Sequence, residues 1–269
     1  MKLGVNVPNF GPGTDPGVLR EWARIVEGLG FDILMMSDHV AVTPDVAAQY
    51  PEPFYEPFTT LSWLAGVTTG LRLGTTVLVL PYRHPLLVAR MSANLNQLSG
   101  GRLVLGVGVG WARQEFDALG VPFTERGKLT DEYLIALRDA WRAQGTIPLP
   151  IWVGGNSEAA IRRAATFGDA WHPLGLGLPR LRSALASHPL PAFAPRIALR
   201  LTSTPVTDPV RPPGIGSIEQ ILDDLDQLRL LGAETVVFDP YHGDPEETRQ
   251  PHAAWRALTA VATHWRTPS

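Results

Sequence analysis

The sequence of 269 residues contains no cysteine. This absence excludes disulfide bonds, thiolate nucleophiles, iron–sulfur clusters and zinc sites built from cysteine. Basic residues are not in excess either, because 23 lysines and arginines stand against 26 aspartates and glutamates, for a net charge of −3. No basic surface therefore predicts a nucleic acid or an anionic membrane as a partner.

Long apolar runs and a secretory leader are also missing. No uninterrupted apolar run approaches the roughly 20 residues that cross a bilayer. Residues 1–10 have the pattern of a strand, without the basic and apolar regions of a signal peptide. Together with the lack of cysteine, these absences lead us to expect a cytoplasmic protein without membrane association.

The sequence does contain a long apolar run, LVLGVGVGWAR, over residues 103–113. Such a run is typical of a parallel strand that is buried on both faces. Gly106, Gly108 and Gly110 remove the side chains from one face, so something lies close against the backbone there. Two occupants fit this place, another segment of the chain or a flat ligand.

Strand and helix patterns alternate along the chain. Besides the glycine-rich run, strands are predicted over residues 2–8, 32–37, 72–80, 150–153, 170–172, 196–203 and 234–239. Amphipathic helices are predicted between them, one over 130–143 with Thr130 or Asp131 as its cap, and a last one over 246–265. Eight such units predict a closed (β/α)8 TIM barrel, with an open doubly wound sheet as the alternative. No break in composition divides the chain, so residues 1–269 are expected to form a single domain.

In a barrel of this kind the active site lies where the strands end and the following loops begin. Polar and aromatic side chains gather at these positions, among them Asn6, Asn9, Ser37, Asp38, His39, Tyr82, Arg83, His84, Trp111, Trp171, His172, Asp239, Tyr241 and His242. A proline-rich stretch, about residues 40–57, follows the second strand. It exceeds the usual connection length, which predicts a lid or a wall of the site.

Two short motifs at the strand ends suggest chemistry. Gly154 and Gly155 lead directly into a helix, whose free N–H groups and dipole suit a phosphate. The alternative is an ordinary turn with Ser157 as the helix cap. Asp38 and His39 end the second strand, and the imidazole suits proton transfer near neutral pH. The alternative there is a carboxylate that caps a turn and a histidine that packs.

Five segments resemble the bacterial luciferase-like flavin barrel superfamily, and more closely its branch that uses the deazaflavin coenzyme F-420. They are FDILMMSDH (31–39), LGTTVLVLPYRHPLLVAR (73–90), LSGGRLVLGVGVGWARQEFDALGVPFTERG (98–127), PIWVGGNSEAAIRRAATFGDAWHP (150–173) and LLGAETVVFD (230–239). The resemblance implies a luciferase-like barrel that moves hydride between F-420 and an unidentified small organic substrate. An FMN-dependent monooxygenase on the same fold is the alternative. A homodimer is expected, because relatives commonly form one.

The resemblance also implies roles for single residues. His39 lies near the hydride-transfer position and is the predicted catalytic residue, while Asp38 hydrogen-bonds the ring. A non-proline cis peptide between Thr76 and Val77 backs the ring, and the coenzyme's phosphate lies at the paired glycines. The predicted cofactor-binding residues are Asp38, Thr76, Val77, Gly108, Gly154, Gly155 and Asn156.

Three further residues or sets allow more than one interpretation. Trp111 stands where some deazaflavin sugar-phosphate dehydrogenases carry an acidic Glu, so oxidation of a sugar phosphate is not expected. Its indole either shapes a pocket or packs in the core. Arg83 pairs either with an anionic ligand or with a loop carboxylate. A metal-dependent hydrolase built on Asp38, His39, His84 and Asp239 is a third functional hypothesis. Because the sequence has no HxH pair and no HExxH helix, no metal site is predicted.

Overall fold

Eight parallel strands form the centre of the computed structural model, which describes residues 1–145 and 148–266. In space they follow the order β7, β6, β5, β3, β2, β1, β11, β8. Hydrogen bonds from Arg196 N–H to the Pro173 carbonyl (2.8 Å) and from Gly175 N–H to the Arg196 carbonyl (2.9 Å) join β7 to β8 and close the ring. The predicted (β/α)8 barrel is thus confirmed. The strands are β1 (Lys2–Asn6), β2 (Ile33–Met36), β3 (Arg72–Thr75), β5 (Leu103–Gly108), β6 (Ile151–Gly154), β7 (Ala170–His172), β8 (Arg196–Ala198) and β11 (Thr235–Asp239).

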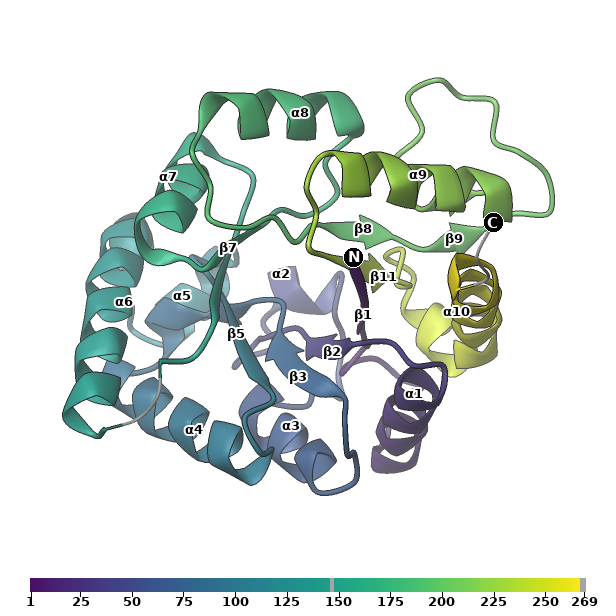
Figure 1. Cartoon of the computed structure of the whole chain (residues 1–269). Helices are drawn as coiled ribbons and strands as arrows, with labels where there is room; N and C mark the ends of the chain where they lie inside the picture. Colours follow the sequence, from purple (N-terminus) through teal and green to yellow (C-terminus); the bar gives the residue numbers. More distant parts are fainter. Residues whose placement is uncertain (146–147, 267–269) are drawn as a thin grey trace.

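Helices surround the barrel (Figure 1). The longer ones are α1 (Pro16–Gly28), α3 (Pro57–Ala65), α4 (Pro85–Leu98), α6 (Arg126–Ala143), α7 (Glu158–Phe167), α8 (Leu178–Ser187), α9 (Ile218–Leu230) and α10 (Pro251–Arg266). Local chemistry sets several starts: Asp15 caps α1, and Ser217 with Gln220 forms a capping box at α9. Over the part of the chain that the structure describes, none of the helices combines the length and hydropathy that a bilayer-spanning segment requires.

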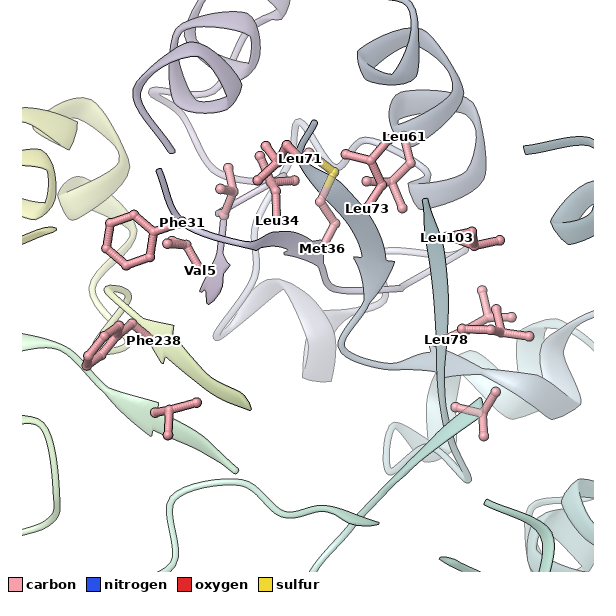
Figure 2. Close-up of a cluster of buried hydrophobic side chains, with 14 of the residues drawn as sticks. Val5, Phe31, Leu34, Met36, Leu61, Leu71, Leu73, Leu78, Leu103 and Phe238 are labelled. Atoms are coloured by element: carbon pink, nitrogen blue, oxygen red, sulfur yellow. The ribbon is translucent and has the colours of Figure 1, made fainter. Parts of the chain in front are cut away.

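The main hydrophobic core lies between the strands and the surrounding helices. Figure 2 shows Leu34 and Met36 of β2 and Leu73 of β3 near Leu61 of α3. These four side chains are completely buried. Burying one such side chain stabilises the fold by about 1.5–3 kcal/mol, so this layer supplies most of the hydrophobic driving force.

A second, smaller cluster fills the inside of the barrel. Because side chains alternate along a strand, Ile33, Met35, Val104 and Trp152 point the opposite way from the outer core. Gly4 makes room for them, since a Cβ on it would lie 2.4 Å from Ile33 Cγ2. The interior is therefore packed, and polar groups are left for the layer nearer the carboxyl ends of the strands.

Three predicted elements are divided in the structure. The strand predicted over 72–80 is interrupted, because β3 ends at Thr75 and β4 (Leu78–Val79) follows a cis peptide between Thr76 and Val77. The strand predicted over 196–203 is also split: β8 ends at Ala198, and β9 (Arg200–Leu201) pairs with β10 (Ile215–Gly216). The helix predicted over 246–265 is preceded by a separate 3-10 turn, η3 (Pro245–Arg249).

The prediction for the helix before β6 was wrong at its start. The helix α6 begins at Arg126, and Thr130 lies buried inside it. The Thr130 hydroxyl donates to the Arg126 carbonyl at 2.7 Å, so it bonds back within the helix and does not cap it. Two short helices, α2 (Pro44–Ala47) and α5 (Arg113–Ala118), were not predicted, because so few residues carry no readable helical period.

Candidate active site

A cavity of about 280 Å³ opens at the carboxyl ends of the strands. Its volume lies near the lower end of small-molecule sites, which span about 300–1,000 Å³. The eight site residues predicted from the sequence all border it, although they are spread over more than a hundred positions. They are Asp38, His39, Thr76, Val77, Gly108, Gly154, Gly155 and Asn156.

The glycine-rich face of β5 is covered by another segment of the chain. A Cβ on Gly106 would lie 1.9 Å from the Thr75 carbonyl oxygen, and one on Gly108 would lie 2.5 Å from Val77 Cγ2. A Cβ on Gly154 would lie 2.6 Å from Cγ1 of the same Val77 side chain. The predicted cis peptide between Thr76 and Val77 is confirmed. Of the two occupants that the sequence allowed, the chain itself takes the place, and Gly108 makes room for Val77.

His39 is joined to a buried carboxylate that sequence reasoning missed. Its Nδ1 lies 2.6 Å from Glu115 Oε2, and the Glu115 side chain is completely buried. The N–H groups of Val40 and Ala41 also donate to Glu115 Oε1, at 2.5 and 3.0 Å. The only hint in the sequence is an acidic residue beside an apolar Phe116 in a segment too short to be read as a helix.

The Glu115 carboxyl is ionised at neutral pH. Burial raises the pKa of Glu115. The hydrogen bond and charge of His39 and the two backbone N–H groups lower it by more than burial raises it, so the pKa lies below its usual value. An ionised carboxylate only accepts hydrogen bonds. His39 therefore directs a protonated Nδ1 toward Glu115.

Aromatic rings enclose His39 on the other sides. Tyr50 stacks on it at 5.5 Å between centroids, while Phe54 and Trp111 meet it edge-on at 5.4 and 5.7 Å. Tyr50 lines the cavity, so the stretch of residues 40–57 forms a wall of it, as predicted. Trp111 is 45% exposed at the cavity. It shapes the pocket and is not a core residue.

Asp38 and Arg83 form a bidentate ion pair. Arg83 Nη1 and Nη2 donate to the two Asp38 oxygens at 2.8 Å each, and Val79 N–H donates to Asp38 Oδ2 at 2.9 Å. Arg83 also donates to Glu56 at 3.0 Å. Of the two interpretations of Arg83, pairing with carboxylates is therefore correct.

A polar chain crosses the floor of the cavity. Arg196 pairs with Asp239 through Nε (2.9 Å) and donates from Nη1 to the Thr76 carbonyl (2.7 Å). The Thr76 hydroxyl lies 2.8 Å from His172 Nε2, and His172 Nδ1 donates to the Ala194 carbonyl. Burial lowers the pKa of His172 to about 4, so this imidazole is neutral. The sequence placed His172 and Asp239 on the rim but did not single out Arg196.

The paired glycines lead into α7 at the edge of the cavity. Ser157 caps the helix by accepting from Ala160 N–H. Asn156 Nδ2 donates to the Leu174 carbonyl (2.7 Å) and Asn156 Oδ1 accepts from Leu174 N–H (3.0 Å), which ties this turn to the loop after β7. Gly155 has φ of +120°, a conformation that side chains rarely adopt.

Arg163 of α7 does not add positive charge to this turn. It is buried and donates to Asp131 on α6 and to the Gly127 carbonyl. The metal hypothesis finds no support either. Across residues 1–145 and 148–266 no group of three or more potential ligand side chains gathers for a metal ion. Asp239 pairs with Arg196, and His84 caps α4.

Several known proteins resemble this chain in sequence or in fold. An uncharacterised protein of Mycobacterium tuberculosis is 34% identical in an alignment of 180 positions, which covers 55% of this chain and 62% of that protein. The oxygenating component of 3,6-diketocamphane monooxygenase from Pseudomonas putida, in complex with FMN, superposes with a TM-score of 0.72 and 15% identity over 97% of both chains. Coenzyme F-420-dependent tetrahydromethanopterin reductase from Methanopyrus kandleri gives 0.71 and 15%, again over 97% of both.

The matched part of the Mycobacterium tuberculosis protein is less than two thirds of its length, and at 15% identity the two solved structures share the fold alone. The family model of the luciferase-like monooxygenases matches residues 1–194, which is well over half of the chain. The chain therefore belongs to the luciferase-like monooxygenase family.

Proposed function

We propose that this chain transfers hydride between the deazaflavin coenzyme F-420 and a small organic substrate in the cavity. The observation that carries the proposal is the convergence of the eight predicted site residues on this one cavity. The residues fit such a coenzyme: Val77 offers an apolar surface for a planar ring, and Gly154 and Gly155 line the cavity just before the N-terminus of α7, where a phosphate can bind. When bound, the coenzyme supplies the atom that accepts or donates hydride.

His39 accepts the substrate proton that is released when hydride is transferred. When an alcohol is oxidised to a carbonyl compound, the hydroxyl proton has to go to a base while the hydride leaves the carbon. His39 borders the cavity, and its Nδ1 is already engaged by Glu115. Its Nε2 is therefore the ring nitrogen that serves the substrate.

The substrate in this proposal is uncharged. The charged groups at the cavity are already paired, Asp38 with Arg83 and Arg196 with Asp239. The remaining walls include the aromatic rings of Tyr50 and Trp111. Recognition thus rests on apolar contact, because an anionic substrate finds no free cation among the described residues that line the cavity.

Titration of the purified chain with F-420 and with FMN tests the proposal. We expect F-420 to bind with quenching of its fluorescence, and bound reduced coenzyme to be oxidised by a ketone or aldehyde without oxygen. Binding of FMN alone, with an oxygen atom from O2 appearing in the product when reduced FMN is supplied, would instead establish the monooxygenase. Binding of neither coenzyme would refute both.

A matched pair of variants at Ser157 tests the position of the phosphate. Aspartate and asparagine both cap helices well, so Ser157→Asp and Ser157→Asn should fold alike. Only the aspartate places a negative charge at the start of α7. We expect Ser157→Asp to raise the Kd for the coenzyme about 10-fold, which is about 1.4 kcal/mol, and Ser157→Asn to leave it unchanged. Equal affinities would place the phosphate elsewhere.

A further inference from the structure

We infer that Glu115 is a positioning residue that fixes the tautomer of His39, so that Nε2 carries no hydrogen in the neutral ring and accepts the substrate proton. The catalytic use of that tautomer rests on the function proposed above. The tautomer itself is a property of the chain without coenzyme, and it is measured separately.

The three contacts of Glu115 leave it one way to bind His39. Val40 and Ala41 N–H both donate to Oε1, and His39 Nδ1 lies 2.6 Å from Oε2. A carboxylate has no hydrogen to give, so Nδ1 has to be the donor. The neutral ring then holds its single hydrogen on Nδ1.

The carboxylate is held rigidly enough for this role. Glu115 belongs to α5, and its neighbour Gln114 exchanges hydrogen bonds with Asp45 on α2. Gln114 N–H donates to Asp45 Oδ2 (3.3 Å), and Asp45 N–H donates to the side-chain oxygen Oε1 of Gln114 (3.4 Å). The Glu115 side chain is completely buried. Tyr82 packs nearby, and burial followed by the negative charge of Glu115 raises the pKa of its hydroxyl, which stays neutral. Glu115 therefore stays in place when His39 gains a proton.

The Nε2 side of the His39 imidazole is available to a substrate in the cavity. In the described part of the chain no hydrogen bond engages His39 Nε2, while Tyr50 and Trp111 hold the ring from its face and edge. In alcohol oxidation the O–H bond breaks and its proton forms a bond to Nε2, while the C–H bond breaks, the hydride passes to the oxidised coenzyme of the proposed function, and the carbon becomes a carbonyl carbon. The imidazolium that results is stabilised by the Glu115 charge behind it, the role that the buried aspartate has in a serine protease triad.

The variant Glu115→Gln tests the inference, because it should reverse the tautomer. Val40 and Ala41 N–H require an oxygen acceptor, so the glutamine oxygen stays with them. The amide NH₂ then faces His39 Nδ1 and donates to it. The ring hydrogen moves to Nε2, and the proton acceptor at the cavity is lost.

Two-bond proton–nitrogen correlation spectra of the coenzyme-free, ¹⁵N-labelled chain read the tautomer directly. The His39 signals are assigned by their absence from His39→Gln. We expect the neutral ring to be protonated on Nδ1 in the native chain and on Nε2 in Glu115→Gln. When the chain oxidises an alcohol with oxidised F-420, kcat should be about 10³–10⁴-fold lower in Glu115→Gln, while the Kd for the coenzyme stays the same.

Glu27→Gln is the matched control. Glu27 of α1 also accepts backbone N–H groups, from Thr69, Gly70 and Leu71, and none of these residues lines the cavity. It should leave the His39 tautomer and kcat unchanged.

Two results would overturn the inference: an Nε2-protonated neutral ring in the native chain, which needs no variant to fold, or an unchanged tautomer in a folded Glu115→Gln. If neither coenzyme binds, the proposed function fails, yet the spectra still decide the role of Glu115.

Discussion

Replacing Gly106 by alanine tests whether the chain itself, and not a ligand, requires the glycines of β5. The added Cβ would lie 1.9 Å from the Thr75 carbonyl oxygen, whereas ordinary contacts begin at 3.4 Å. The two backbones therefore have to separate by about 1.5 Å. The Thr75 hydroxyl, which donates to the Gly106 carbonyl at 2.6 Å, is carried along.

The cost of this separation lies at the upper end of overpacking, about 3 kcal/mol, because backbone atoms have no alternative rotamer. With a urea slope of about 3 kcal/mol per molar, the unfolding midpoint should fall by about 1 M. Gly28→Ala is the control, since it ends α1 and an added Cβ meets nothing within 4 Å. Alanine there should keep or slightly raise the midpoint.

Urea unfolding followed by circular dichroism measures both variants, and coenzyme titration follows in the native buffer. We expect Gly106→Ala to lower both the midpoint and the coenzyme affinity, since Val77 is displaced with Thr75. An unchanged midpoint with a loss of affinity alone would contradict the reasoning. It would mean that the glycine face makes room for a ligand.

Three other changes have defined outcomes. Asp239→Asn leaves the buried Arg196 without its anion and should lower the free energy of unfolding by about 3–5 kcal/mol; a loss below 1 kcal/mol in urea would refute the pairing. Arg83→Met leaves Asp38 buried and without its cation, and thermal unfolding should show a loss of similar size; an unchanged unfolding temperature would contradict the prediction. Because the pKa of His172 is lowered from 6.5 to about 4, the unfolded chain binds more protons between these values, and stability falls as the pH drops. His172→Gln should remove about 2 kcal/mol of the stability difference between pH 7.5 and pH 5, and equal pH profiles would contradict the lowered pKa.

The position of the predicted residues at the barrel edge followed from local signals. A strand that ends in polar residues brings them to this edge, which is why the sequence placed Asp38, His39 and Asn156 there. The helix caps at Asp15 and Ser217 depend on neighbours within three residues, and these too are readable. The cis peptide before Val77 came from family resemblance, since no local pattern predicts one.

The partners of those residues were decided by the tertiary structure. Glu115 meets His39 across 76 positions, and Arg196 meets Thr76 across 120. Which buried polar groups pair depends on how distant loops come to rest over the barrel, and no periodicity encodes that. The sequence by itself thus determined eight strand–helix units and the rim of the site. Long-range packing decided which ring nitrogen of His39 carries the hydrogen and which segment covers the glycines of β5. Hydrogen bonds and contacts of this kind form only once the ring of strands has closed.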